Sequence, residues 1–234
     1  MLFRSLYKHM FGWRVLAGPF AGLQYLPGSV GSVHFAKLLG TYELELRPLV
    51  EDLISLAPRI VINVGAGEGY YAVGLAFRLP GARIIAFETD AGARAMIGQM
   101  AGLNNVADRL DIRGHCTGPD LAAALAGDGP VAIVMDVEGA EIELLDPERI
   151  PALARAAILV EVHDFAAPVG EVLRARFSSS HALQETWSRP RQARDLPRPI
   201  QLMAMSPWRR QAVNVMDERR PGPMRWFWLQ PLAG

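Results

Sequence analysis

Ionisable side chains that could transfer a proton follow two strongly apolar segments of the chain. Asp136 and Glu138 come after one of them, and His163 closes the next. If both segments are parallel strands of one sheet, these side chains meet at its carboxyl edge. Histidine titrates near neutral pH, so His163 is the first candidate for a general base and Asp136 the second, with Glu138 on the substrate side. In the simpler alternative, His163 only hydrogen-bonds the adjacent loop, and Asp136 touches a bound ligand.

Two further carboxylates belong to this group. Glu138 and Glu141 are three residues apart and would share a helix face, where a structural role in the first turn suits Glu141 best. Asp136, Glu138, His163 and Asp164 could offer oxygen and nitrogen ligands to a metal ion. Nothing in their spacing requires one, so we expect no metal.

A glycine-rich loop interrupts the stretch IVINVGAGEGYYAVGLA, residues 60–76. An apolar run breaks at Gly65, Gly67 and Gly69 and then resumes with helical spacing. Strand, turn and helix place this loop at the carboxyl edge of a sheet, where glycine permits close approach of a ligand. The dinucleotide fingerprint is GxGxxG, whereas this loop reads GxGxG, with Tyr70 in the place of the third fingerprint glycine. A dinucleotide is therefore disfavoured.

Two glutamates narrow the class of ligand. Glu68 lies inside the loop, where its charge would repel a pyrophosphate. Glu88 ends the next apolar segment, in position to accept hydrogen bonds from both hydroxyls of a ribose. Together they indicate an adenosyl group without a diphosphate. The alternative is that the glycines serve only a tight turn and that Glu88 is a solvated strand end.

The scaffold that must position these residues follows from alternating β-rich and helical segments. Strands this uniformly apolar are buried on both faces, and their alternation with helices implies right-handed crossovers. We predict an α/β fold with a doubly wound, mostly parallel sheet and helices on both faces. The expected strands are 59–64, 82–88, 109–113, 131–136, 156–163, 181–187 and 224–230. The expected helices are 41–58 with Thr41 as N-cap, 70–79, 91–105, 119–127, 140–146, 167–177 and one from Ser206.

Length and charge bound the organisation and the partners. The 234 residues suffice for one domain at 41–234 and an N-terminal arm at 1–40, and the Arg- and Trp-rich segment 188–223 reads as a substrate cap or an interface. Twenty-four basic and 24 acidic residues cancel, so no long-range field favours nucleic acid. Residues 15–36 carry no Asp, Glu, Lys or Arg, but glycines and prolines interrupt them. We expect no transmembrane span, although residues 1–36 could touch a membrane surface or a second subunit of a homodimer.

The single cysteine, Cys116, can form no internal disulfide. There is no CxxC pair and no Cys/His cluster with zinc spacing. A reducing compartment fits best, and we predict a cytoplasmic protein.

Three motifs give the chain a family resemblance. They are GTYELEL at 40–46, VINVGAGEGYYA at 61–72 with AFETD at 86–90, and MDVEGAEIELL at 135–145. The chain resembles the Rossmann-like methyltransferases that depend on S-adenosylmethionine, and more narrowly the FkbM family. The resemblance implies a seven-stranded sheet whose last strand runs antiparallel. It also implies S-adenosylmethionine as cofactor, lying over Gly65, Ala66, Gly67 and Gly69 with its ribose on Glu88.

Further cofactor contacts enter through this resemblance. Asn63 stands where such enzymes often have an acidic residue near the ammonium of the methionine moiety; asparagine can accept a hydrogen bond there but supplies no charge. The loop after the third strand usually contacts adenine, so His115 and Cys116 are candidates. For Cys116, the simpler reading is a small buried hydrophobe.

The implied activity is O-methylation of a small-molecule hydroxyl, on a sugar or a natural product. Methylation of nucleic-acid amino groups is disfavoured because residues 136–139 read DVEG where an Asn/Asp-Pro-Pro-Tyr-type element would stand. Two alternatives stay open. One is a non-catalytic cofactor-binding or scaffolding protein on the same fold. The other is an NAD-dependent oxidoreductase, against which the GxGxG spacing and the lack of a Tyr-x-x-x-Lys pair both speak.

Overall fold

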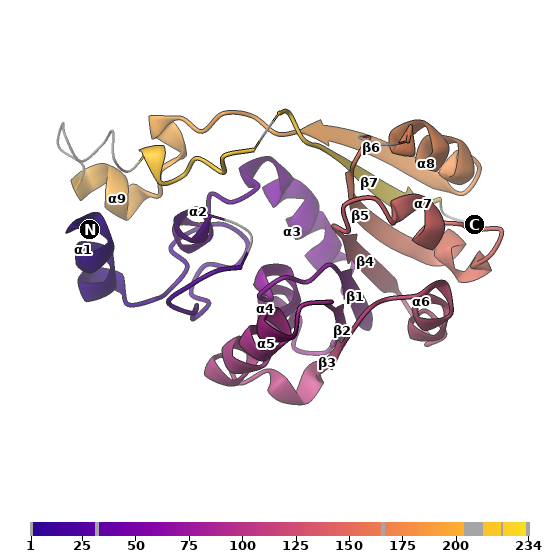
Figure 1. The fold of residues 1–234 in the computed structure, drawn as a ribbon, viewed down its shortest axis with the longest axis horizontal. Coiled ribbons are helices and arrows are strands. Elements are labelled where there is room, and N and C mark those ends of the chain that lie inside the picture. The colour runs from indigo at the N-terminus through magenta and orange to yellow at the C-terminus, as the bar shows by residue number, and fades with distance from the viewer. Residues whose placement is uncertain (1, 31–32, 165–166, 204–212, 221, 233–234) are drawn as a thin grey trace.

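Seven strands form one continuous sheet in the computed structural model of the chain (Figure 1). The structure describes residues 2–30, 33–164, 167–203, 213–220 and 222–232. The strand order is β3-β2-β1-β4-β5-β7-β6, with β1 to β5 parallel and β7 antiparallel to both of its neighbours. The predicted doubly wound sheet with an antiparallel last strand is confirmed. The strands are β1 (Ile60–Val64), β2 (Arg83–Phe87), β3 (Leu110–Arg113), β4 (Val131–Met135), β5 (Ala156–Val162), β6 (His181–Trp187) and β7 (Arg225–Pro231).

The register of the central strands decides where chemistry can occur. Val64 at the end of β1 is paired with Phe87 of β2 on one side and with Met135 of β4 on the other. These three strands therefore end level with one another. The residues that come next, among them Glu88 and Asp136, must gather at one edge of the sheet.

Helices cover both faces of the sheet, as two separate hydrophobic clusters record. Helices α3, α4 and α5 pack on one face, and α6, α7 and α8 on the other. Local signals fix several boundaries: Asp90 caps α5 by accepting a hydrogen bond from the amide of Ala93 at 2.7 Å. The helices are α1 (Leu2–Phe11), α2 (His34–Leu39), α3 (Arg47–Ser55), α4 (Tyr70–Arg78), α5 (Ala91–Leu103), α6 (Gly118–Ala124), α7 (Glu141–Leu144), α8 (Val169–Phe177) and α9 (Arg198–Met203).

The first long helix begins later than the sequence predicted. Thr41 does not cap it, since its hydroxyl instead donates to the carbonyl of Ala36 at 3.3 Å. Glu43 adopts a left-handed backbone conformation with φ 45°, and a 3-10 turn at Leu44–Leu46 leads into α3. The N-cap prediction was wrong because Glu43 is held by side chains from distant parts of the chain, described below, and not by its own helix.

The N-terminal segment contributes to the same core as the sheet. Phe20, Leu23 and Leu38 are fully buried in the cluster that includes the helices of one face. Phe20 also packs so closely on Gly74 of α4 that a Cβ there would lie 2.6 Å from its ring. Within the described ranges, no helix combines the length and apolar composition needed to cross a membrane. The start of the helix predicted from Ser206 lies outside the described residues.

Candidate active site

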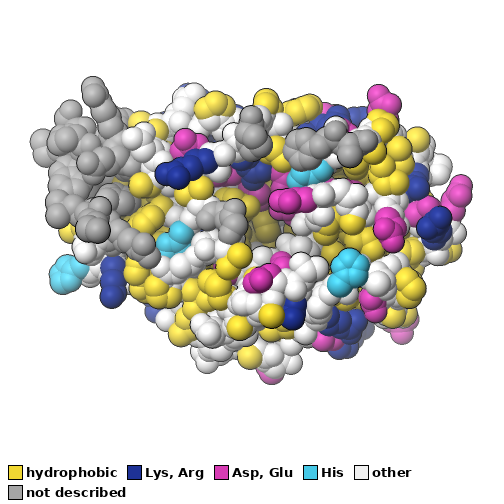
Figure 2. Space-filling view, in the orientation of Figure 1, with side chains coloured by type: hydrophobic (Ala, Val, Ile, Leu, Met, Phe, Trp, Pro, Cys, Tyr) yellow, Lys and Arg dark blue, Asp and Glu magenta, His cyan; other side chains and the backbone are white. Residues whose placement is uncertain are grey.

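A cavity of about 490 Å³ lies at the carboxyl edge of β1, β2 and β4. The space-filling view shows acidic and histidine side chains around a hollow on this face (Figure 2). Among the described residues, neither Gly69 nor His163 belongs to its lining. The predicted site residues that do line it are Asn63, Gly65, Ala66, Gly67, Glu88, His115, Cys116, Asp136 and Glu138.

The three loop glycines have different structural roles, although all have positive φ. A Cβ on Gly65 would lie 1.7 Å from the backbone oxygen of Asp136, so this glycine lets two strand ends approach each other. A Cβ on Gly69 would lie 3.2 Å from Ile97, which places this glycine at the contact of α4 with α5. A Cβ on Gly67 would meet nothing within 4 Å. Of the three, Gly67 is the position where a ligand can approach the backbone.

Glu88 places its carboxylate against the glycine loop. Its Oε2 accepts a hydrogen bond from the Gly67 amide at 2.7 Å, and its Oε1 accepts from the Asp90 amide at 2.8 Å. Two backbone donors thus fix the carboxylate at the tip of β2 while it still lines the cavity. A carboxylate has about four acceptor positions, so capacity remains for the hydroxyls of a ribose.

Asn63 presents an unsatisfied acceptor at the cavity. The side chain is buried, and its Nδ2 donates to the carbonyl of Val134 at 3.2 Å. This bond fixes the amide orientation and leaves Oδ1 buried without a hydrogen-bond partner. A buried acceptor without a partner is costly, so a donor from a ligand, such as an ammonium, suits this position.

Glu68 does not act as the free negative charge that the sequence suggested. Its carboxylate is buried and accepts hydrogen bonds from the Tyr25 hydroxyl at 2.6 Å and from Ser29. The ammonium of Lys37 lies 2.5 Å from Oε1. Burial by itself raises the pKa of Glu68, but Lys37 and the hydroxyls outweigh it and lower this pKa. The carboxylate is therefore ionised, but its charge is balanced by Lys37, so it would not repel a pyrophosphate as the sequence suggested.

His163 lies behind Asp136 and is oriented by Glu141. Its Nδ1 is 2.5 Å from Oε1 of Glu141, and its Nε2 is 3.7 Å from Oδ1 of Asp136. Burial lowers the pKa of His163, but the hydrogen bond to Glu141 and the charge of Asp136 outweigh burial and raise it. The two predicted proton-transfer residues are thus neighbours, and Asp136 is the one that lines the cavity.

The predicted helix face shared by Glu138 and Glu141 is absent. Helix α7 begins at Glu141, whereas Glu138 and Gly139 have φ of 50° and 122°. Two consecutive positive φ values cannot continue a right-handed helix, so Glu138 stays in the loop and lines the cavity while Glu141 turns inward to His163.

Glu161 is a member of this group that the sequence analysis missed. It is buried, hydrogen-bonds Asp136, and offers an oxygen within 4.8 Å of ligand atoms on Asp136 and His163. Burial, followed by the charges of Asp136 and Glu43, raises the pKa of Glu161 to about 9. At neutral pH it therefore keeps a proton. The alternation of β5 was the available signal, since residues 161 and 163 point to the same face of a strand.

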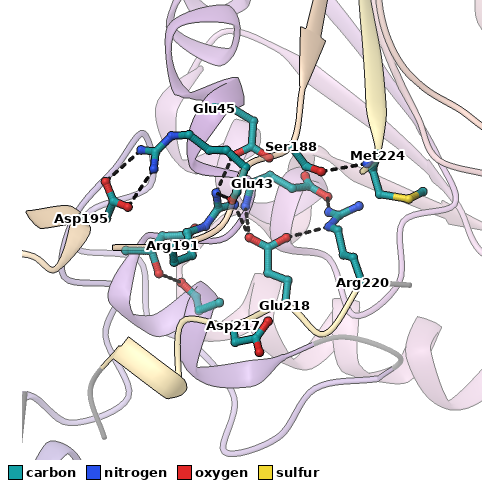
Figure 3. A network of polar contacts seen from close by, with 12 residues as sticks. Glu43, Glu45, Ser188, Arg191, Asp195, Asp217, Glu218, Arg220 and Met224 are labelled. Atoms are coloured by element: carbon teal, nitrogen blue, oxygen red, sulfur yellow. Dashed lines mark hydrogen bonds and ion pairs between the residues drawn. The ribbon is translucent and has the colours of Figure 1, made fainter. Parts of the chain in front are cut away.

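Arg220 joins this group to distant parts of the chain (Figure 3). Its guanidinium lies 2.5 Å from Glu161, 2.6 Å from Glu43 and 2.9 Å from Glu218. Burial raises the pKa of Glu43 to about 7 even beside this arginine. Arg220 thus anchors the C-terminal segment on both β5 and the stretch before α3.

Other arginines of the predicted cap are also engaged internally. Arg191 binds Glu45 at 2.6 Å and also Glu218, and Arg189 binds Asp195 at 2.8 Å (Figure 3). These guanidinium groups are consequently not presented to an anionic substrate. Two others, at positions 209 and 210, lie outside the described residues.

The remaining predicted residues have simpler surroundings. His115 and Cys116 line the cavity on the side of β3. Burial raises the pKa of the Cys116 thiol to about 12, which makes it a neutral, apolar contact. Asp164, part of the metal-ligand set considered above, instead accepts hydrogen bonds from the Gly170 amide at 2.9 Å and from Arg225.

Comparison with known proteins identifies the fold. No family model and no curated protein matches the chain. Among solved structures, a human methyltransferase 10 domain containing protein has 15% identity and a TM-score of 0.50, over 98% of this chain and 93% of that one. The chain has the Rossmann-like methyltransferase fold.

Two O-methyltransferases with bound cofactor are also similar. TomG from Streptomyces achromogenes, involved in tomaymycin synthesis and in complex with SAM, has 15% identity and a TM-score of 0.45 over 79% of this chain and 80% of its own. An enzyme from Bacillus cereus in complex with SAH has 13% identity and a TM-score of 0.48 over 88% and 84%.

Proposed function

We propose that the protein is an S-adenosylmethionine-dependent methyltransferase that O-methylates a small-molecule hydroxyl. The observation that carries the proposal is the composition of one cavity at the carboxyl edge of a methyltransferase-type sheet. Gly67 provides open backbone, Glu88 a fixed carboxylate, and Asn63 a buried oxygen without a partner. These groups match the backbone contact, the ribose hydroxyls and the ammonium of the cofactor.

The chain's own residues would then align and deprotonate the acceptor. When bound, S-adenosylmethionine supplies an electrophilic methyl group on its sulfonium. Transfer is an in-line displacement, so the protein must hold the acceptor oxygen on the line through the methyl carbon and the sulfur and exclude water. Asp136 faces the cavity and would accept the hydrogen bond of the hydroxyl. His163, with its Nδ1 held by Glu141, lies where it can take the proton from the side of Asp136.

The charge of the cavity wall around Asp136 indicates the chemical class of the acceptor. Tyr42, Asp136 and Glu138 line the cavity, and the neighbouring arginines are occupied by carboxylates. A neutral hydroxyl that donates a hydrogen bond suits such a wall better than a phosphate or a carboxylate does. Membership of the FkbM family, a sugar or natural product as acceptor, and a cytoplasmic location complete the proposal, on the motifs and the single cysteine described above.

Calorimetric titration with S-adenosylmethionine, S-adenosylhomocysteine and NAD tests the proposal. We expect the two sulfur compounds to bind and Glu88→Ala to weaken both about tenfold to a hundredfold, the usual size of charge-assisted hydrogen bonds. Glu148→Ala, at an exposed carboxylate of the same type, should leave both affinities unchanged. Binding of NAD alone would instead favour an oxidoreductase.

A further inference from the structure

The chain contains two lysines, Lys8 and Lys37, among 24 basic residues. Lys8 is exposed on α1, whereas Lys37 on α2 is buried and lines the cavity. Among the described lining residues, Lys37 is the one lysine or arginine. A residue from the N-terminal segment thus brings a cation to the cavity wall, where it is paired with Glu68.

The surroundings of Lys37 leave donor capacity on its ammonium. The Nζ atom contacts Glu68 at 2.5 Å and lies 4.8 Å from the ring centre of Tyr42 and 5.6 Å from that of Tyr70. An ammonium has three N–H donors, and the hydrogen bond to Glu68 uses one of them. The aromatic faces add a cation–π attraction that holds the group in place.

Glu68 does not need Lys37 for its hydrogen bonds. The same Oε1 also accepts from the hydroxyls of Tyr25 and Ser29, and the Val30 amide lies 3.4 Å from Oε2. The lysine therefore supplies charge to a carboxylate that is already hydrogen-bonded. Because the Lys37 ammonium makes one hydrogen bond and lines a ligand cavity, it can also bind an anionic group of the ligand.

The loop separates two ends of the cavity. The Gly67 amide binds Glu88, the predicted ribose contact, and the adjacent residue Glu68 reaches to Lys37. The amino-acid end of S-adenosylmethionine is a zwitterion that needs an acceptor for its ammonium and a donor for its carboxylate. Asn63 offers the acceptor, since its Oδ1 has no partner, and Lys37 offers the matching donor.

We propose that Lys37 binds the carboxylate of the amino-acid end of the cofactor, so that the N-terminal segment completes the cofactor site. The inference rests on the proposed function. It assigns to residues before the first strand a role that the glycine loop alone cannot fill, because the loop supplies no side-chain cation.

Two ligands separate this role from general damage to the cavity. S-adenosylhomocysteine carries the amino-acid end, whereas 5′-methylthioadenosine has the same adenosyl thioether without it. By calorimetry, Lys37→Met should weaken S-adenosylhomocysteine about tenfold or more, as expected for a charge-assisted contact, and leave 5′-methylthioadenosine at its wild-type affinity. Lys8→Met is the matched control and should change neither affinity.

Because Lys37→Met leaves Glu68 buried without its cation, the double variant Lys37→Met/Glu68→Gln is measured as well, against Glu68→Gln alone. The double variant should show the same selective loss of S-adenosylhomocysteine. Unchanged S-adenosylhomocysteine affinity, or equal losses for both ligands, overturns the role of Lys37 while the methyltransferase proposal stands. If the wild-type protein binds neither ligand, the proposed function fails and the role of Lys37 fails with it.

Discussion

The two sides of the cavity, named the cofactor half and the acceptor half after the roles proposed above, balance their charges differently. On the cofactor half, Lys37 forms an ion pair with Glu68, and two backbone amides hold the carboxylate of Glu88. Behind the acceptor half, and not lining the cavity, Arg191 and Arg220 share four carboxyl groups, those of Glu43, Glu45, Glu161 and Glu218. Asp136 adds a fifth, hydrogen-bonded to one of these four.

Because of this difference, the protonation of the cofactor half is fixed near neutral pH, whereas that of the acceptor half depends on pH. Where charges pair one to one, the carboxylate is ionised and the geometry stays fixed, as the lowered pKa of Glu68 reflects. Where carboxyl groups outnumber guanidinium groups in a buried site, protons make up the balance, and the pKa values of Glu43 and Glu161 rise to about 7 and about 9. In the proposed reaction, a half that stores protons suits the end of the cavity where the acceptor hydroxyl would lose one.

Removal of Arg220 should have the largest effect and should break the acceptor half. Arg220→Met leaves several buried carboxyl groups without their cation, so we expect a loss of about 3 to 5 kcal/mol in the free energy of unfolding. Urea unfolding measures it. Arg194→Met, at an exposed position of the same segment, is the control and should cost almost nothing. A loss for Arg220→Met no larger than for Arg194→Met would mean that the acceptor half holds its charge without this arginine.

Two substitutions in the glycine loop, which lies between the halves, test how closely β1 and β4 approach each other. Gly65→Ala places a Cβ against the Asp136 carbonyl at positive φ, and we expect it to cost about 2 kcal/mol or more. Gly67→Ala adds a Cβ in open space, so only the conformational cost of about 1 to 2 kcal/mol remains. Thermal or urea unfolding ranks the two. If Gly67→Ala were the more destabilising, Gly65 would not be the contact point of β1 with β4.

A pH series of stability measurements should sharpen the comparison further. Glu161 is raised from 4.5 to about 9, so the folded state holds a proton that the unfolded state releases between these values. Its stabilising contribution is complete below pH 4.5 and is lost as the pH rises towards 9. The free energy of unfolding should therefore fall as the pH rises through this window. Its slope against pH should correspond to about one fewer bound proton in Glu161→Gln than in the wild type. Glu148→Gln should keep the wild-type slope, and an identical slope in Glu161→Gln would remove Glu161 from the proton store.

Much of the fold could be read from the sequence because it depends on local patterns. The seven predicted β segments became seven strands, and Gly65, Glu88 and Asp136 reached one edge because parallel strands end level there. Thr41 failed as a helix cap because a cap residue acts only if the chain beside it is free to start a helix. Glu43, pulled into a left-handed conformation within the Arg220 network, prevents that start.

Some residues of the candidate site could likewise be predicted from local sequence, and others could not. The strand-end residues on the acceptor side were predicted because each follows an apolar run. Arg220 and Lys37 were not, since nothing in their immediate sequence marks a buried charge. Glu161 was missed although the alternation of β5 offered a signal. Their partners lie far along the chain, as with Arg220 and Glu43, which are 177 residues apart.

The sequence by itself determined the alternation of strands and helices, the glycine loop and the carboxylate that closes β2, because hydrophobic periodicity and backbone conformation act over a few residues. Only the tertiary structure decided that Gly65 accommodates a neighbouring strand, that Glu68 is neutralised by Lys37, and that Arg191 and Arg220 of the C-terminal segment bind buried carboxyl groups. Burial strengthens charge interactions between residues of any separation, and the fold alone brings such residues together.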